Sequence, residues 1–302
     1  FEHPLEIRVS VTVEGSNIIV DYTGTADQIP HPVNSPLTFT QAYSCYAIKC
    51  ALDPGTPIND GAFRPITVTA PKGCLVNPDR PAPVWGRHLS GHYMPPAIYG
   101  ALSSIVPDKV IADCGSPLWN VYFRGQKEKG ARPFVKMFFM NGGHGARPTQ
   151  DGPGCLSFPS NVSNQAIEQF ENQTPLLVEE KALVPDTGGA GRFQGGNAQR
   201  LTFRNIGHGP VGVTIRHERV DNPRRGLRGG GGGAGEIDMI DVDRVPTKTQ
   251  SHIDPGDGVT CQTPGGGGMG PASDRDPAAV RRHLASGLVS PAFAKQHYGI
   301  EK

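Results

Sequence analysis

The sequence predicts an α+β protein in which β-rich mixed sheets and long glycine-rich loops outweigh a few short helices. Short apolar or alternating segments recur along the 302 residues, and 40 glycines and 29 prolines interrupt them. Asp276-Pro277 and Ser290-Pro291 each open a stretch that ends at a glycine, which predicts two short helices at the C-terminus. We expect residues 1–270 to form a β-rich region and residues 271–302 a helical tail packed on it.

Periodicity places the elements of the first third. Alternation over residues 5–21 around a Glu-Gly-Ser-Asn turn predicts a hairpin. Helical spacing of apolar residues predicts a helix with one apolar face, formed by Phe39, Ala42, Tyr43, Tyr46, Ala47, Cys50 and Ala51. Residues 64–70 read as a strand and residues 96–105 as a second helix.

The rest of the chain is predicted to be mainly strands. The expected strands are residues 110–114, 120–124, 134–140, 176–184, 199–204, 211–216, 236–242 and 258–262. The nearly continuous apolar run 134–140 predicts a central strand buried on both faces. A short helix is expected over residues 164–170.

Composition excludes several classes of protein. A net charge of +1 without a long basic run argues against nucleic-acid binding, and the three arginines between positions 224 and 228 read as a solvated turn. No apolar stretch approaches the roughly 18 residues that a membrane span needs. The six cysteines form no C-x-x-C pair and are too sparse for a disulfide scaffold, so we expect reduced thiols and a cytoplasmic protein. The opening at Phe1 reads as mid-domain, which suggests that a segment precedes it.

The stretch 186–196, Asp-Thr-Gly-Gly-Ala-Gly-Arg-Phe-Gln-Gly-Gly, organises the chain. A glycine inside a helix or strand costs about 0.5–1 kcal/mol relative to alanine. Five in eleven residues therefore indicate positive φ angles or close approach of another backbone or a ligand. We expect this loop at a buried interface with a missing N-terminal half or a partner subunit. Gly188, Gly189 and Gly191 would permit close approach, Phe193 would be an apolar plug, and Arg192 would hold an anion or bridge to a partner.

Other glycine runs occur at residues 141–146, 229–233 and 265–268. Two G-x-G-x-x-G matches begin at Gly230 and Gly265, but the first leads into a strand and the second is separated from its helix by residues 271–275. A dinucleotide site is therefore disfavoured. The chain has no Gly-Lys pair for a Walker A loop and no G-x-S-x-G for a hydrolase elbow.

Three residues are candidates for catalysis. His144 lies in a glycine turn with Asp151 seven residues later, and loops carry function on a rigid scaffold. The alternative for this turn is stabilisation by side-chain hydrogen bonds. Asp186 either takes part in chemistry or caps the amides of its own loop, and the capping interpretation is favoured.

Metal binding by this chain alone is not expected. His88 and His92 are four residues apart, but Gly91 weakens the helix that would align them and no third ligand stands at a recognised spacing. They are weak candidates, and surface or interface histidines are the alternative.

Several motifs together resemble the C-terminal half of the hydantoinase B/oxoprolinase family, in order from Tyr22 to the end of the chain. They are Asp21-Tyr-Thr-Gly-Thr-Ala with Asn34, Arg64-Pro-Ile before Pro71-Lys-Gly, Asn141-Gly-Gly-His-Gly-Ala with Asp151-Gly, the stretch 186–196, Pro264-Gly-Gly-Gly-Gly-Met-Gly, and an ending from Arg275-Asp-Pro to Tyr298-Gly. Gln194 stands where we expect arginine, and Ala198 where glycine is common. These two departures weaken any anion-binding role of the loop.

The resemblance implies part of an ATP-dependent enzyme that opens a cyclic amide such as a hydantoin, 5-oxoproline or a lactam. It implies ATP and Mg²⁺ on a hydantoinase A-type subunit, and a divalent metal in an N-terminal half that is a separate chain or a missing segment. Glycine loops with free N–H groups would then stabilise an oxyanion. Two alternatives stay open: a subunit of an acetone- or acetophenone-type carboxylase, and a scaffold half that does no chemistry. The substrate, the stoichiometry and the residues that do chemistry are not determined by the sequence.

Overall fold

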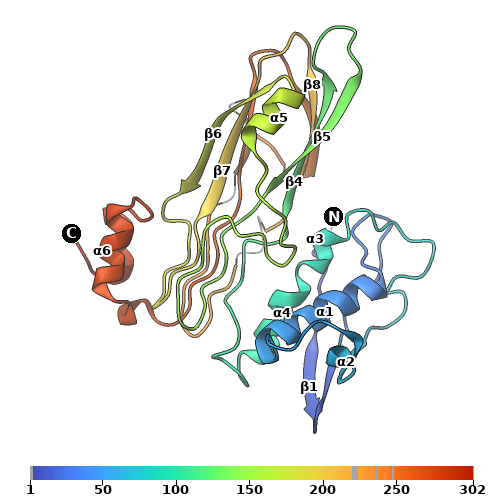
Figure 1. The fold of residues 1–302 in the computed structure, drawn as a ribbon, viewed down its shortest axis with the longest axis vertical. Coiled ribbons are helices and arrows are strands. Elements are labelled where there is room, and N and C mark those ends of the chain that lie inside the picture. The colour runs from blue at the N-terminus through green and yellow to red at the C-terminus, as the bar shows by residue number, and fades with distance from the viewer. Residues whose placement is uncertain (1–2, 220–223, 236, 242, 247, 302) are drawn as a thin grey trace. The chain divides into compact units, whose positions relative to one another are not determined.

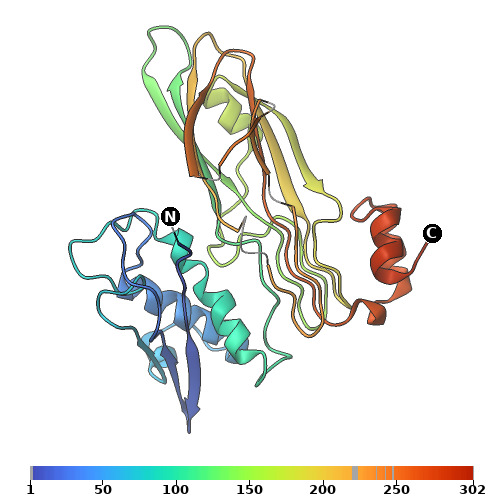
Figure 2. The same cartoon turned by 180° about the vertical axis from the view of Figure 1, so that it is seen from behind.

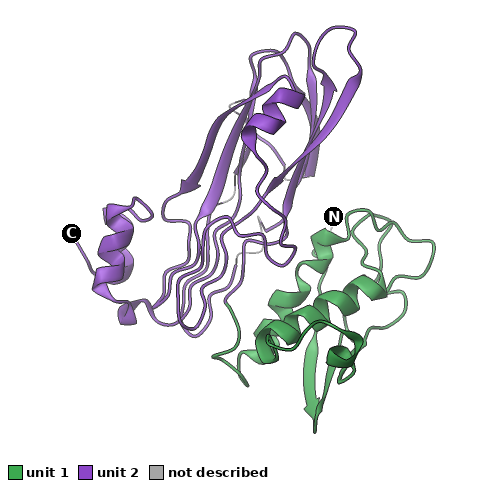
Figure 3. Ribbon diagram, viewed as in Figure 1, with its two compact units in different colours: residues 1–111 green, residues 112–302 purple. Residues whose placement is uncertain are grey.

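A computed structural model describes residues 3–219, 224–235, 237–241, 243–246 and 248–301. The chain separates into two compact units, residues 1–111 and 112–302 (Figure 3). Helices and antiparallel or mixed sheets occur in separate stretches of the chain, so the expected α+β class is confirmed. Among the described residues, no helix is both long and apolar enough to cross a membrane.

The first unit is a small mixed sheet with helices. Strands β1 (Ser10–Glu14) and β2 (Asn17–Asp21) form the expected hairpin, and β3 (Ile66–Thr69) pairs with β2 in parallel. The helices are α1 (Leu37–Leu52), α2 (Asp60–Phe63), α3 (His88–Gly91) and α4 (Met94–Leu102). The helix expected over residues 39–51 is confirmed, but of its predicted apolar face only Ala47 and Ala51 are buried. It buries a face of small residues that includes Thr40, Ser44 and Ala47, because the Ser44 hydroxyl hydrogen bonds to the buried Tyr22 at 2.8 Å.

The second unit contains two packed sheets (Figure 1). One has the order β11-β8-β4-β5, formed by β11 (Lys248–Ile253), β8 (Val211–Arg216), β4 (Trp119–Gln126) and β5 (Pro133–Met140). The other has the order β10-β9-β12-β7-β6, formed by β10 (Asp243–Arg244), β9 (Ile237–Ile240), β12 (Gly258–Gln262), β7 (Ala198–Asn205) and β6 (Leu176–Val184). Their inner faces share one apolar core, which helix α5 (Ile167–Gln173) completes with Phe170.

Two expected strands differ in the structure. Residues 134–140 do form a strand, but β5 lies at the edge of its sheet, and Val135 is 73% exposed. The apolar run suggested burial on both faces of the strand, but only one face of β5 packs on the core. Residues 110–114 form no strand; from Ala112 onward they enter a different arrangement of extended backbone.

That arrangement is a bundle of extended, glycine-rich segments, here called the glycine bundle. The segments are 112–116, 141–146, 151–154, 187–197, 224–234 and 263–270, called segments 1 to 6 below. They run side by side between the two sheets and the C-terminal helices in both views (Figures 1 and 2). Few of their residues belong to a regular strand, yet their backbone N–H groups donate to carbonyl groups of neighbouring segments.

Segment 6 shows the geometry most clearly. Gly265 and Gly268 donate to segment 5, at 3.1 and 2.9 Å, and Gly266 and Met269 donate to segment 4, both at 2.9 Å. Gly267 donates to segment 1 at 2.8 Å. From Gly265 to Met269 the direction of the N–H group thus repeats every three residues, as in a threefold extended helix rather than a pleated strand. One segment can therefore bond to several neighbours around it.

Glycine is required here for close approach. A Cβ atom on Gly265, Gly266, Gly267 or Gly268 would lie 1.9–2.2 Å from a carbonyl oxygen of another segment. None of these four has a φ in the left-handed region. Of the two explanations that the sequence left open, close backbone approach is the correct one for this run.

The C-terminal tail is helical, as expected. After a 3₁₀ turn at Ala272–Asp274 come α6 (Pro277–Ala285), capped by Asp276, and α7 (Pro291–Tyr298), capped by Ser290 and ended by Gly299 in the left-handed conformation. The tail belongs to the second unit. The predicted division of the chain into a β-rich region, residues 1–270, and a separate tail, residues 271–302, stays a prediction.

The close packing of the glycine bundle predicts the effect of glycine-to-alanine substitutions, which add one methyl group. Gly266→Ala places Cβ 2.1 Å from the carbonyl oxygen of His144, so we expect a loss of about 3 kcal/mol or more in the free energy of unfolding. Gly231→Ala is the matched control in segment 5, because its nearest neighbour atoms are 3.4 Å away. That change should stay within about 0.5 kcal/mol. Urea unfolding of the intact protein measures both, and equal midpoints would contradict the packing described here.

Candidate functional site

His144 lies in segment 2 with its ring enclosed by the bundle. Its backbone N–H donates to the Pro153 carbonyl at 2.9 Å, and its carbonyl accepts from Gly196 at 2.8 Å. The ring Nδ1 is 2.7 Å from the Gly145 carbonyl oxygen, and Phe158 packs edge-on at 5.4 Å. Because a carbonyl only accepts, Nδ1 carries the proton and Nε2 keeps a lone pair.

Burial lowers the pKa of His144 to about 4, although the hydrogen bond to Gly145 acts in the opposite direction. The imidazole is therefore neutral at neutral pH. It can accept a proton or a hydrogen bond through Nε2, but it is not an imidazolium that gives one up.

Asp151, the second candidate, holds the tail onto the bundle. Its carboxylate forms a bidentate pair with Arg275, at 2.7 and 2.8 Å, and accepts from the Gln194 N–H at 2.7 Å. His283 Nε2 of α6 lies 3.3 Å away. Burial would raise the pKa of Asp151, but these contacts, above all those of Arg275, bring it well below its usual range. The carboxylate is ionised and fully engaged, which favours a structural role.

Asp186 also contacts the tail. Its Oδ1 accepts from the Ser290 N–H at 2.7 Å, and its own N–H donates to the Leu288 carbonyl at 3.3 Å. The residue has a φ of 65°. Asp186 was expected to cap the amides of its own loop, but its carboxylate instead accepts from the amide at the start of α7. The two ends of the loop are joined by side chains instead: Asn197 accepts from the Gly188 N–H, and Thr187 accepts from the Ala198 N–H at the start of β7.

The loop 186–196 is buried by its own chain. Gly189 donates to Gly266 at 2.8 Å and receives a bond from Gly195 at 2.9 Å, and Gly188 and Gly191 would each bring a Cβ within 2.7 Å of a backbone atom. We expected a missing half or a partner to order this loop. The described neighbours of its glycines are other glycine segments of this chain, and a contact with a missing half or a partner stays a prediction.

Arg192 and Phe193 form the part of the loop that is not enclosed. Arg192 is exposed, and its guanidinium lies 5.4 Å from the centre of the Phe193 ring. Phe193 is half-buried and packs on the small cluster of Ala112, Ala146 and Met269. The apolar plug thus fits into this chain, while the arginine stays accessible.

The hypothesis of an oxyanion hole made from free glycine N–H groups is wrong for segment 6. Every N–H from Gly265 to Gly270 donates to a carbonyl of another segment. A phosphate or oxyanion would have to replace these bonds. The same accounting excludes the G-x-G-x-x-G match that begins at Gly265 as a ready phosphate cradle, and in the other match Gly230 donates to the Leu227 carbonyl at 3.0 Å.

His88 and His92 lie in the first unit, at the two ends of the four-residue helix α3 and its cap. The ring centres are 5.8 Å apart, and the Tyr43 hydroxyl lies 3.2 Å from His92 Nε2. Burial, followed by the neighbouring His88, lowers the pKa of His92 to about 3. In the described part of the chain no third histidine, cysteine or carboxylate joins this pair to make a metal site.

Sequence reasoning missed two features of the second unit. Arg224 was read as part of a solvated turn, but it is 1% exposed and donates to the Gly265 carbonyl at 3.3 Å. Arg219 is also buried and forms a bidentate pair with Asp113. The second feature is a buried group of His217, Asp238 and Cys261. No local spacing signals either one, because the partners are distant in sequence.

The Hydantoinase B/oxoprolinase family matches residues 2–272. The chain belongs to this family. It is 31% identical over 310 residues to the putative B component of a D-/L-hydantoinase from a Pseudomonas species, covering 98% of this chain and 52% of that protein. It is 26% identical over 275 residues to 5-oxoprolinase 1 of Arabidopsis thaliana, covering 88% of this chain and 20% of that protein. The chain thus spans about half the length of the first of these relatives, and less of the second.

Two solved structures share the fold of this hydantoinase B-family chain. The ATP-dependent caprolactamase of Pseudomonas jessenii has a TM-score of 0.86 at 23% identity, over 97% of this chain and 53% of that one. An acetone carboxylase in its nucleotide-free form has a TM-score of 0.81 at 19% identity, over 96% of this chain and 44% of that one. These similarities establish the fold.

Gln194, which departs from the residue expected in the family, has a structural use here. It is buried, and its side-chain oxygen accepts from the Tyr298 hydroxyl at 3.3 Å. The same oxygen lies 3.1 Å from His283 Nδ1. The amide therefore joins the loop to both C-terminal helices. Its side chain is neutral and its oxygen is engaged, so it does not replace the expected arginine as an anion-binding group.

The contacts of Asp151 predict how the tail is held. Asp151→Asn removes the charge that Arg275 is paired with, and the Arg275 side chain is only 1% exposed. We expect a loss of about 3 kcal/mol in the free energy of unfolding, because an uncompensated charge stays buried. Hydrogen exchange should show faster opening of α6 and α7 than in the parent.

The matched control is Glu179→Gln, which breaks the more exposed pair of Glu179 and Arg204 and should cost much less, because solvent screens that pair. Because the pKa of Asp151 is lowered on folding, its contribution is complete above about pH 5 and is lost as the pH falls below about 4. Asp151→Asn should lack this part of the acid dependence. A tail equally protected in both variants would contradict the assignment.

Proposed function

We propose that this chain is the C-terminal half of the hydantoinase B-type component of an ATP-dependent cyclic-amide hydrolase. The observation that carries the proposal is the alignment of 98% of the chain with the putative B component of a D-/L-hydantoinase. The family match over residues 2–272 supports it. The substrate class is a small ring that contains an amide, such as a hydantoin, 5-oxoproline or a lactam.

The chain needs partners for this reaction. The N–H groups of segment 6, from Gly265 to Gly270, are all used internally, so they do not fit the phosphates of ATP. We propose that ATP and Mg²⁺ are bound by a hydantoinase A-type subunit, and that a catalytic divalent metal is bound by the N-terminal half of the hydantoinase B component.

What this chain contributes is a rigid framework with two functional groups. The bundle fixes His144 as a neutral imidazole, which is suited to accept a hydrogen bond or a proton. Arg192 is exposed beside Phe193, and we propose that it contacts the N-terminal half or the partner subunit. The residues Gly188, Gly189 and Gly191 position this arginine by holding the loop against segments 5 and 6.

Two alternatives remain, each with its own support. The similarity of fold to an acetone carboxylase, at a TM-score of 0.81, supports a role in a ketone carboxylase. The engagement of Asp151 and Asp186 in bonds to the tail supports a scaffold half without chemistry of its own. The higher identity to the hydantoinase relative favours the hydrolase.

Turnover tests the proposal directly. The intact protein, purified with its hydantoinase A-type partner, should hydrolyse ATP in proportion to the opening of a hydantoin, 5-oxoproline or a lactam. Acetone or acetophenone with bicarbonate serves as the control substrate pair. Carboxylation without ring opening would replace the hydrolase with the carboxylase alternative.

His144 separates the catalytic from the scaffold interpretation. In His144→Asn the side-chain amide can still donate to the Gly145 carbonyl, while the Nε2 lone pair is lost. If His144 acts in catalysis, turnover should fall by about 100-fold or more with assembly unchanged by size exclusion. Because its pKa is lowered to about 4, no step of activity near pH 6.5 should depend on it. Full activity in His144→Asn would favour the scaffold.

A further inference from the structure

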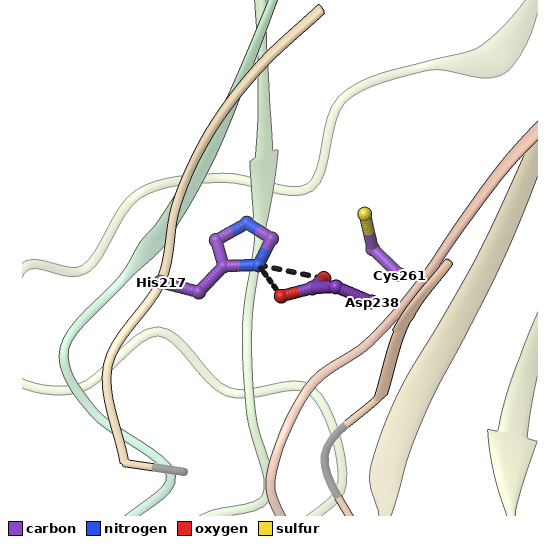
Figure 4. A group of neighbouring side chains, drawn as sticks. All are labelled: His217, Asp238 and Cys261. Carbon is purple, nitrogen blue, oxygen red and sulfur yellow. Dashed lines mark hydrogen bonds and ion pairs between the residues drawn. The ribbon is translucent and has the colours of Figure 1, made fainter. Parts of the chain in front are cut away.

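A histidine, a carboxylate and a thiol meet inside the core of the second unit. His217 directly follows β8 in one sheet, while Asp238 on β9 and Cys261 on β12 are directly opposite one another in the other sheet. One ligand atom from each lies within 4.8 Å of the other two (Figure 4). The group thus bridges the two sheets at one point.

All three side chains are enclosed. His217 and Cys261 are 0% exposed and Asp238 is 3% exposed. The imidazole ring stacks on Trp119, with ring centres 3.7 Å apart and 11° between the planes. Such packing fixes the ring, and it leaves a carboxylate and a thiol in an otherwise apolar core.

Not every polar atom of these three side chains has a hydrogen-bond partner. His217 Nδ1 is 2.9 Å from both carboxylate oxygens of Asp238, on the side of the ring that faces the cluster (Figure 4). His217 Nε2 is buried and has no hydrogen-bond partner among the described residues. Buried polar atoms are seldom left so, but a metal held by Nδ1 does not contact Nε2. The case for a ligand therefore rests on Nδ1, the Asp238 carboxylate and the Cys261 thiol, which lie together in the core.

We propose that His217, Asp238 and Cys261 bind one divalent metal ion of the zinc type, which ties the two sheets together. The donor set of nitrogen, oxygen and sulfur suits Zn²⁺ and related transition metals, whereas Mg²⁺ and Ca²⁺ take oxygen ligands. Coordination displaces the Cys261 thiol proton, which passes to solvent. The proton on His217 Nδ1 moves to Nε2 as Nδ1 exchanges Asp238 for the metal, so the imidazole stays neutral.

The charges balance in the bound state. One dication, one thiolate and one carboxylate sum to zero beside a neutral imidazole, so the metal removes the cost of a buried anion. Metal–ligand bonds of about 2.0–2.3 Å place tetrahedral ligands roughly 3.3–3.6 Å apart. The present separations, 2.9 Å for His217 to Asp238 and up to 4.8 Å overall, approach these values through small side-chain movements.

This site is independent of the proposed reaction and has a structural role, because none of its ligands is exposed. It also reverses the sequence-based expectation that no metal is bound by this chain alone. No fourth histidine, cysteine or carboxylate joins the group among the described residues, so a tetrahedral set would be completed by a water molecule.

Metal content tests the proposal. The intact protein, freed of any affinity tag, is loaded with Zn²⁺, dialysed and analysed by mass spectrometry of the metal. Cys261→Ser and Asp238→Asn should each lose about one equivalent per chain relative to the parent. The control is Cys74→Ser, a buried cysteine of the first unit, which should lose none. Any metal bound outside these residues is constant in all four proteins.

Cobalt provides a readout of the ligand itself. Co²⁺ in the unaltered protein should give a thiolate-to-metal charge-transfer band, which Cys261→Ser removes and Cys74→Ser keeps. Because the parent spectrum requires no variant to fold, an unstable variant leaves the test intact. A parent protein without the band, or equal zinc content in parent and Cys261→Ser, would overturn the proposal and leave His217 and Asp238 as a simple buried pair.

Discussion

The hydrogen bonds between the glycine segments are the constraint on which the second unit depends. In segment 6 the N–H groups of Gly265 to Gly268 each reach a carbonyl of a neighbouring segment, and a Cβ on any of these residues would overlap that neighbourhood. The threefold repeat lets one chain segment bond in several directions, which a flat sheet does not allow. Glycine is costly to order, but here the amides of the segment are satisfied in return.

Charged side chains close the ends and flanks of this bundle. Arg219 pairs with Asp113, Arg224 reaches the Gly265 carbonyl, and Arg275 joins Asp151 to the tail. These groups are buried or nearly so, and arginine suits such sites because its planar fork donates to carboxylates and carbonyls at once. The helices α6 and α7 are thereby attached to the loop that contains Arg192 and Phe193. Rigidity of the loop follows from contacts at both of its ends.

For function, the consequence is a chain that orients groups more than it exposes them. His144 is held neutral within the bundle, and Asp151 and Asp186 are committed to the tail. A hydrolase or carboxylase assembled from several parts needs such a framework, since small misplacements of reacting groups are costly. The buried group of His217, Asp238 and Cys261 would serve the same end in the core between the sheets.

The sequence by itself determined the α+β class, the hairpin, strands β6, β8 and β12, the two capped C-terminal helices and the family, because these depend on local periodicity, caps and ordered motifs. It also marked the loop 186–196 as a place of close approach. Only the tertiary structure decided that the neighbours of this loop belong to the same chain, that Asp186 binds Ser290, and that Arg224 is buried. It alone brought His217, Asp238 and Cys261 together. The physical reason is that hydrogen-bond partners and ligands of this kind are chosen by position in space, and backbone-to-backbone bonding between glycines leaves no side-chain pattern to read.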